Sequence, residues 1–345
     1  MSISPTKRLS MEGVDVEART ISSELGNLGL DSSKEAGDGS SFLPGTTPEA
    51  LFYVLPYLGL KELLTLETVS SQLREAIRGD VTLWQQLHVD VPLNRKLTDA
   101  ELVGLSSRSH GRLQSLSLIK CIRLSESVIE HIVEANPMLQ KLNLSACTGV
   151  SAEAVLRMVK IQTERRSPHI PGLTQLRIRG LYGVTPEILE SLQRMMQSEG
   201  NHSASDVIPS PHYYKNGEPS PAISEEQLID IEACPKCRTA RLVFDCTRPT
   251  CEQRRNIPLQ QCRGCYLCIA RCEECGVCID GDDYEETFCM EFLCQSCWLR
   301  LPKCSECNRA GCSRHIEALD ISETSIFSCD SCQGVLPGDT GPIFD

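Results

Sequence analysis

The spacing of apolar residues between Pro48 and Leu87 predicts three short amphipathic helices. Apolar side chains at helical spacing form three stripes: Leu51, Val54, Leu55 and Leu58; Leu60, Leu63, Leu64 and Leu66; and Val69, Leu73 and Ile77. Gly59 separates the first stripe from the second, and Ser70 or Ser71 can cap the third helix. A unit of about forty residues buries too little surface to be stable alone. Its apolar faces must therefore be covered by the rest of the chain or by another protein.

A repeated pattern further along the chain predicts strand–turn–helix units. Three lines share the template L-x-x-L-x-[LI]-x-x-[CL], whose alternating inner positions suit a short strand with one buried face. Ser125, Ser151 and Thr185 stand twelve residues after the first leucine of each line and are good N-cap residues for a following helix. The lines comprise Leu113, Leu116, Leu118 and Cys121; Leu139, Leu142, Leu144 and Cys147; and Leu173, Leu176, Ile178 and Leu181.

A looser fourth copy precedes these three lines. Trp84, Leu87 and Val89 match the strand positions, and Thr98 with Glu101 predicts a capping box. Trp84 therefore belongs both to the helical segment and to the first repeat, which leaves no free linker between them. Stacked units of this kind place parallel strands on a concave face and helices outside it.

Composition argues against several classes of protein. The net charge of −12 disfavours a nucleic-acid binder, because phosphate contacts need a basic face. No run of eighteen apolar residues is present, so we expect no membrane span, and the N-terminal residues lack the apolar core of a secretory signal. We therefore expect the chain in the nucleus and/or the cytoplasm, where thiols stay reduced.

The cysteines are concentrated in the last third of the chain. Only Cys121 and Cys147 precede residue 234, and we interpret both as small buried apolar residues. In a reducing compartment, the many pairs with two residues between the cysteines indicate zinc ligands rather than disulfides. The predicted ligands are Cys234, Cys237, Cys246, Cys251, Cys262, Cys265, Cys268, Cys272, Cys275, Cys278, Cys289, Cys294, Cys297, Cys304, Cys307, Cys312, His315, Cys329 and Cys332.

The number of ligands limits the number of ions. Eighteen cysteines and one histidine give nineteen ligands, and four tetrahedral sites use sixteen, so we predict about four zinc ions. The last ligands divide either sequentially or as a cross-brace, with Cys294, Cys297, Cys312 and His315 on one ion and Cys304, Cys307, Cys329 and Cys332 on another. The run from 262 to 278 is too dense to assign. Sites made almost wholly of thiolates are normally structural, so we expect no catalytic zinc.

Residues 48–87 resemble an F-box, and the repeats are similar to leucine-rich repeats of the cysteine-containing kind. Thr47 replaces the leucine usual before the opening proline, and Leu73 replaces the usual tryptophan. The matching residues are Pro48, Leu51, Leu55, Leu58, Leu63, Leu66, Val69, Ser70, Leu83, Trp84 and Leu87. The resemblance implies that a Skp adaptor is bound by Pro48, Leu51, Leu55, Leu58, Leu63, Leu66, Val69 and Ser70.

The order of these parts resembles the plant Skp-interacting F-box proteins of the SKIP group. The expected architecture is a multidomain α+β chain. It comprises a disordered tail over 1–45, a three-helix F-box over 46–87, an α/β solenoid of about four leucine-rich repeats over 84–196, a linker over 197–229, a cysteine-rich zinc module over 230–335 and a tail over 336–345.

The resemblance implies a non-catalytic role as the substrate receptor of an SCF-type cullin ubiquitin ligase. Its partners would be the Skp adaptor, the cullin core and a protein substrate, without nucleic acid or membrane. Two alternatives stay open at this point. The zinc region could itself act with a conjugating enzyme, or the chain could be a zinc-dependent interaction scaffold.

Overall fold

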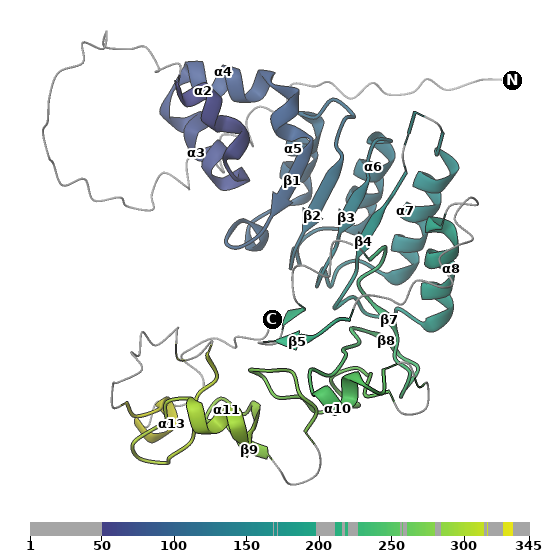
Figure 1. Ribbon diagram of the computed structural model, residues 1–345. Coiled ribbons are helices and arrows are strands. Elements are labelled where there is room, and N and C mark those ends of the chain that lie inside the picture. The colour runs from purple at the N-terminus through teal and green to yellow at the C-terminus, as the bar shows by residue number, and fades with distance from the viewer. Residues whose placement is uncertain are drawn as a thin grey trace, which may run out of the picture. The chain divides into compact units, whose positions relative to one another are not determined.

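A computed structural model describes residues 50–167, 169–170, 172–197, 211–215, 218–219, 227–255, 257, 261–279, 284–313, 316 and 327–333. The chain divides into two compact units, residues 1–198 and 199–345, and each is described by itself (Figure 1). The tails predicted over 1–45 and 336–345 lie outside the described residues. Every described helix is too short or too polar to cross a bilayer.

The first unit begins with the short helices predicted from the three apolar stripes. Its elements are α2 (Ala50–Val54), the 3-10 turn η1 (Leu55–Tyr57), α3 (Leu60–Val69), α4 (Ser71–Gly79) and the 3-10 turn η2 (Val81–Trp84). Leu63, Leu73 and Ile77 are buried between these elements. The indole N–H of Trp84, itself almost wholly buried, donates to the carbonyl of Ile77 at 2.8 Å. The tryptophan thereby fixes the end of α4 to the start of the following strand.

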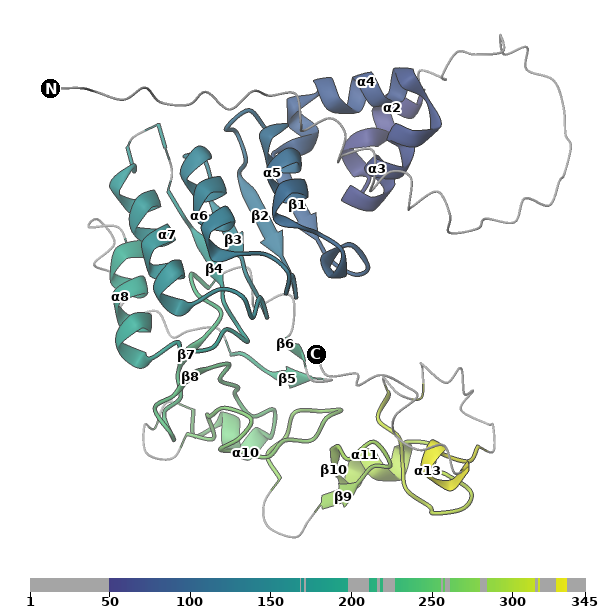
Figure 2. The ribbon, with the colours of Figure 1, turned by 180° about the vertical axis from the view of Figure 1, so that it is seen from behind.

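A parallel sheet and a layer of helices form the rest of the first unit (Figures 1 and 2). The strands run in the order β1 (Gln86–Val89), β2 (Ser115–Leu118), β3 (Lys141–Asn143) and β4 (Gln175–Arg177). The helices that alternate with them are α5 (Asp99–Ser107), α6 (Glu126–Ala135), α7 (Ala152–Glu164) and α8 (Pro186–Met196), and the 3-10 turn η3 (Leu93–Arg95) follows β1. Equivalent leucines pair across the sheet as one fully buried row: Leu87, Leu116, Leu142 and Leu176.

Helix starts in this unit follow the predicted caps, with one difference. Thr98 and Glu101 make the predicted capping box, and the hydroxyls of Ser151 and Thr185 each accept a helix N–H. Ser125 makes no such bond; its hydroxyl donates to the Asp99 carboxylate of the preceding repeat at 2.7 Å. The Ser151 hydroxyl likewise donates to Glu126 of the preceding repeat, at 2.7 Å, while it also caps its own helix. Both side chains therefore join neighbouring repeats.

A buried carboxylate fastens the helical segment to the repeats. Glu67 on α3 is 1% exposed, and its carboxylate accepts from Arg108 Nη1 at 2.5 Å and from Arg78 Nε at 3.1 Å. Arg108 follows α5 and its guanidinium lies over the Trp84 ring, 4.5 Å from the ring centroid. Burial lowers the pKa of Arg108, and the Glu67 carboxylate opposes that shift. One anion thus connects α3, α4 and the end of α5.

Elements of the second unit are short, which fits a region with few apolar residues. They are β5 (Tyr214–Lys215), β6 (Glu218–Pro219), β7 (Glu232–Ala233), β8 (Ala240–Arg241), α10 (Pro249–Glu252), β9 (Tyr284–Glu286), β10 (Phe292–Cys294), α11 (Gln295–Arg300) and α13 (Asp330–Gln333). Each sheet in this unit is a two-stranded antiparallel pair among the described residues. Two-stranded sheets are at best marginally stable in water, so other interactions must hold this unit together.

Residues 211–215 pack within the second unit, although we predicted a linker over 197–229. Tyr214 is buried against Phe244 and Tyr266, and its hydroxyl donates to the carboxylate of Glu273. The Asp245 N–H donates to His212 O, and the Asp245 carboxylate accepts from the His212 N–H, which adds to this contact. The predicted linker therefore contains a segment that is part of the cysteine-rich unit.

We expect Glu67→Ala to destabilise the first unit by about 3–5 kcal/mol, because it leaves the partly buried Arg108 guanidinium without its anion. Unfolding of the full chain would be followed by Trp84 fluorescence in a Trp298→Phe background. The control is Glu190→Ala, which removes an exposed i,i+4 pair with Arg194 and should change stability by less than about 0.5 kcal/mol. Equal effects of the two substitutions would contradict this assignment.

Candidate metal centres and an exposed apolar face

Sixteen cysteines of the second unit gather into four groups of four. Within each group the Sγ atoms all lie within 4.8 Å of one another, so each group could hold a metal ion. Centre 1 is Cys234, Cys237, Cys265 and Cys268; centre 2 is Cys246, Cys251, Cys262 and Cys278; centre 3 is Cys272, Cys275, Cys294 and Cys297; and centre 4 is Cys304, Cys307, Cys329 and Cys332.

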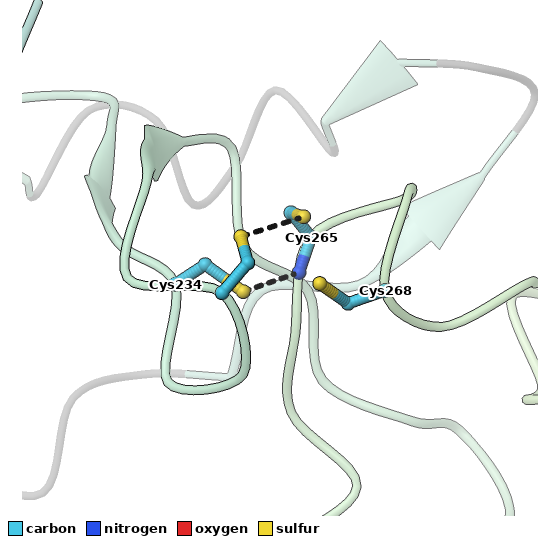
Figure 3. Close-up of side chains that lie close together, drawn as sticks. Cys234, Cys265 and Cys268 are labelled. Carbon is cyan, nitrogen blue, oxygen red and sulfur yellow. Dashed lines mark hydrogen bonds between the residues drawn. The ribbon is translucent and has the colours of Figure 1, made fainter.

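Centre 1 shows how the backbone aims the thiols at one point (Figure 3). The Cys234 N–H donates to Thr239 O at 2.9 Å, and the Arg238 N–H donates back to Cys234 O at 2.7 Å. Arg238 has a φ of +61°, which closes a tight turn directly after Cys237. From the opposite segment, the Cys265 N–H donates to Cys234 Sγ at 3.3 Å. Such N–H groups stabilise negative charge on sulfur.

The same turn recurs at two other centres. In centre 4 the Cys304 N–H donates to Arg309 O, the Asn308 N–H donates to Cys304 O, and Asn308 has a φ of +57°. In centre 3 the equivalent left-handed residue is Gly276. The Cys329 N–H also donates to Cys304 Sγ at 3.3 Å, as its counterpart does in centre 1. The first cysteine pair of centres 1, 3 and 4, with two residues between the cysteines, therefore adopts the same tight turn.

Distances between thiols agree with tetrahedral coordination of a metal ion. Zinc–sulfur bonds of about 2.3 Å place two sulfurs of a tetrahedral site about 3.8 Å apart. One Sγ–Sγ distance in each centre lies at 3.7–3.9 Å: Cys237–Cys265, Cys251–Cys278, Cys275–Cys294 and Cys307–Cys329. Four thiolates are also the donor set that soft divalent ions prefer, so the residues present fit zinc.

Hydrogen bonds prepare individual thiols for binding a metal as thiolates. Burial raises the pKa of the Cys304 thiol, but backbone N–H groups, led by those of Cys307 and Cys329, outweigh burial and lower the pKa to about 6. Hydrogen bonds from the side chain and then the backbone of Thr239 lower the pKa of Cys237 to about 6. Deprotonation of these ligands near neutral pH therefore requires little additional free energy.

The grouping corrects one predicted pairing and confirms another. Cys304, Cys307, Cys329 and Cys332 lie together as predicted in the cross-brace. Cys294 and Cys297 lie with Cys272 and Cys275, whereas the cross-brace placed them with Cys312 and His315. The physical reason is a backbone bond from the Glu273 N–H to Phe292 O, at 2.9 Å, which brings the turn after Cys272 beside Cys294.

Cys289 and Cys312 belong to none of these four centres. Cys289 and Cys312 place their Sγ atoms 3.5 Å from each other. His315 lies outside the described residues. The run from 262 to 278, which the sequence left unassigned, supplies one ligand to centre 2, two to centre 1, two to centre 3 and then one more to centre 2. Centres 1 and 2, and likewise centres 2 and 3, therefore interleave along the chain.

In the first unit, the predicted adaptor-binding residues divide into buried and exposed sets. Leu55 and Leu63 are each only 4% exposed, so they support this chain's own core and do not form an outer face. Leu51 and Val69 are exposed, at 37% and 70%. Leu58, Leu66 and Ser70 are half-buried, and Pro48 lies outside the described residues.

Further apolar residues of this region are exposed: Phe52, Tyr53, Val54 and Tyr57 on α2 and η1. The stripe pattern contained Val54 but missed the three aromatic residues. With Leu51 and Val69 these four residues define what we call the exposed apolar face. A cleft of about 300 Å³ adjoins η1 and is lined in part by Leu58, Gly59 and His88. The sequence signal for this face was the run of four apolar residues from 51 to 54. A helix cannot bury four consecutive side chains against one neighbour, so some of them must be exposed.

Comparison with known proteins establishes the family. F-box protein SKIP28 of Arabidopsis thaliana is 36% identical to this chain over 295 residues, which cover 82% of the chain and 89% of that protein. The chain is an F-box protein of the SKIP group. The family model described as the At3g27290 F-box protein C-terminal domain matches residues 230–306. That match contains centres 1, 2 and 3 and ends within centre 4.

Two further relatives from Arabidopsis thaliana are longer than the region that matches. F-box protein SKIP14 is 32% identical over 245 residues, which cover 71% of this chain and 53% of that protein. F-box protein At3g27290 is 28% identical over 249 residues, which cover 71% of this chain and 64% of that protein. The chain therefore spans about half the length of SKIP14 and slightly less than two thirds of At3g27290.

Removal of metal with a strong chelator at neutral pH should unfold the second unit and leave the first intact, because the second has little apolar core of its own. Limited proteolysis with mass mapping would detect this as rapid cleavage over 230–335 and continued protection of 50–197. Added zinc should restore protection. Unchanged protection over 230–335 after complete metal removal would refute a structural role for the centres.

Gly276→Ala should release residues 211–215 from the second unit. Gly276 has a φ of +70°, and an added Cβ would lie 2.2 Å from the backbone oxygen of Tyr214. Hydrogen exchange at residues 212–215 should accelerate by about tenfold or more, since a left-handed alanine alone costs about 1–2 kcal/mol. Gly79→Ala is the matched control, because nothing lies within 4 Å of its added Cβ. Equal exchange in both variants would contradict the packing described.

Proposed function

We propose that this chain is the substrate receptor of an SCF-type cullin ubiquitin ligase. Residues 46–87 form the F-box and bind the Skp adaptor, which connects the chain to the cullin core. The observation that carries this proposal is the exposed apolar face of α2, η1 and α3, in a chain that belongs to the F-box proteins. Exposed aromatic and aliphatic residues gathered on one short segment are typical of a protein interface.

The repeats and the cysteine-rich unit present the substrate. Residues 84–196 are leucine-rich repeats of a short α/β solenoid, and the equivalent leucines buried in register along the parallel sheet support that assignment. The substrate is a protein, and the chain works in the nucleus and/or the cytoplasm without binding nucleic acid or a membrane.

The chain contributes no catalytic group to ubiquitin transfer. Holding the substrate beside the ubiquitin-loaded conjugating enzyme raises the effective concentration of the reacting groups, which is how such a receptor accelerates the reaction. The four centres hold four structural zinc ions. Four thiolates fill a tetrahedral shell, so a bound ion in any of them has no open position for a substrate or a water.

The full chain carrying Leu51→Asp and Val69→Asp should lose adaptor binding, with affinity falling by about tenfold or more. Both side chains are exposed, so the fold and the metal content should persist. Co-purification and a direct binding measurement with the Skp adaptor would check this. Val91→Asp, at an apolar residue 61% exposed beyond β1, is the matched control and should bind normally.

Undiminished adaptor binding by the double variant would overturn the assigned face. Leu55→Asp and Leu63→Asp are unsuitable for this test, because both side chains are buried and their replacement would unfold the helices. If the purified chain alone accelerated ubiquitin transfer from a conjugating enzyme, the second unit would instead be a ligase module. We expect no such activity.

A further inference from the structure

Cys289 directly precedes a left-handed residue in a tight turn, as Cys237, Cys275 and Cys307 do, although its turn is one residue shorter than theirs. The Met290 N–H donates to Thr287 O at 3.2 Å, the Thr287 N–H donates to Glu291 O at 2.9 Å, and Met290 has a φ of +64°. In centres 1, 3 and 4 a left-handed residue likewise comes directly after the second cysteine of the first pair. A left-handed methionine is uncommon, so this backbone shape is held by its surroundings.

Cys312 resembles the first residue of the second cysteine pair in centres 1 and 4. The Ile316 N–H donates to Cys312 O at 3.1 Å, as the Ile269 N–H donates to Cys265 O and the Gln333 N–H donates to Cys329 O. Each bond closes one helical turn that begins at a cysteine. In those two centres the residue three positions along is the second ligand of the pair, and after Cys312 that residue is His315.

The segments that carry Cys289 and Cys312 are held side by side. The Phe288 N–H donates to Ala310 O at 3.0 Å, and Gly311 lies so close that an added Cβ would come within 2.7 Å of the Phe288 ring. The two Sγ atoms are 3.5 Å apart, near the value of about 3.8 Å expected between two ligands of one zinc ion. A disulfide would require about 2.05 Å.

The order of the ligands along the chain shows which centres the Cys289–Cys312 pair would connect. Centres 1 and 2 interleave, and so do centres 2 and 3, but centres 3 and 4 follow one another without interleaving. Cys289 precedes the second pair of centre 3, and Cys312 lies between the two pairs of centre 4. A shared ion at Cys289 and Cys312 would therefore join centres 3 and 4 across the chain.

We propose that Cys289 and Cys312 are two ligands of a fifth metal centre, for a thiophilic divalent ion of the zinc class. This goes beyond the four all-cysteine centres, and it assigns the two predicted cysteine ligands that those centres leave over.

Native mass spectrometry of the full chain, purified with zinc and a phosphine reductant, tests the proposal. The wild-type chain should carry five zinc ions, and the double variant Cys289→Ala with Cys312→Ala should carry four. Cys121→Ala, at a buried cysteine in the first unit, is the matched control and should keep five.

The count in the wild-type chain decides the matter even if a variant folds poorly. Four ions in the wild type, or a disulfide between Cys289 and Cys312 found by peptide mapping of protein purified under reducing conditions, would overturn the fifth centre and leave the other four intact. No bound zinc would overturn the structural zinc of the proposed function as well, so the two failures are distinguishable.

Discussion

Shortage of buried apolar surface is the constraint on which both units of this chain depend. Three short helices cannot form a sufficient core, and neither can two-stranded sheets joined by turns. The first unit meets the constraint by continuing its core into the repeats through Trp84 and Leu87, both 2% exposed. In the second unit, sixteen cysteines take the place that apolar side chains occupy in an ordinary core. The chain thus combines two ways of stabilising small structural elements.

Attachment of the helical segment to the repeats matters for the proposed role. The Glu67 carboxylate, with Arg108 and Trp84, connects α3 to the end of α5 through contacts that exclude water. A buried ion pair contributes little net free energy, but it tolerates few alternative geometries. A receptor would gain from such a connection, because the direction in which the repeats leave the helical segment is then fixed. Within that segment Leu55 and Leu63 are buried, whereas Leu51 and Val69 are at the surface.

Centres 1, 2 and 3 interleave along the chain. If each holds an ion, loss of one ion would loosen a loop that carries ligands of its neighbour, so metal binding would be cooperative. Backbone N–H bonds to the sulfurs of Cys234 and Cys304 support these thiols from the protein side. Metal binding to such a unit would be coupled to its folding. The packing of Tyr214 against Phe244 extends this unit to residues before the first cysteine.

The sequence alone predicted the features that depend on residues close together in the chain: strands, helix starts and candidate metal ligands. The alternation of leucines gave the strands because side chains in a strand point to opposite faces in turn, and Ser151 and Thr185 marked helix starts because their hydroxyls satisfy unpaired N–H groups. Pairs with two residues between the cysteines marked the metal ligands, since that spacing lets two thiols of one turn face the same point. The family resemblance was likewise carried by short-range patterns between Pro48 and Leu87.

Only the tertiary structure decided which pairs share a centre and which apolar residues face outward. Spacing constrains residues within a turn of each other, whereas the grouping of Cys272 with Cys294 depends on a backbone bond between Glu273 and Phe292. The helical stripes placed Leu51 and Leu55 on one face, but η1 packs against η2, and Leu55 is buried while Leu51 is exposed. The contact of Ser125 with Asp99 in the preceding repeat is likewise one that its cap pattern did not predict. Each of these outcomes depends on contacts between segments that are distant in the sequence, and no local pattern contains that information.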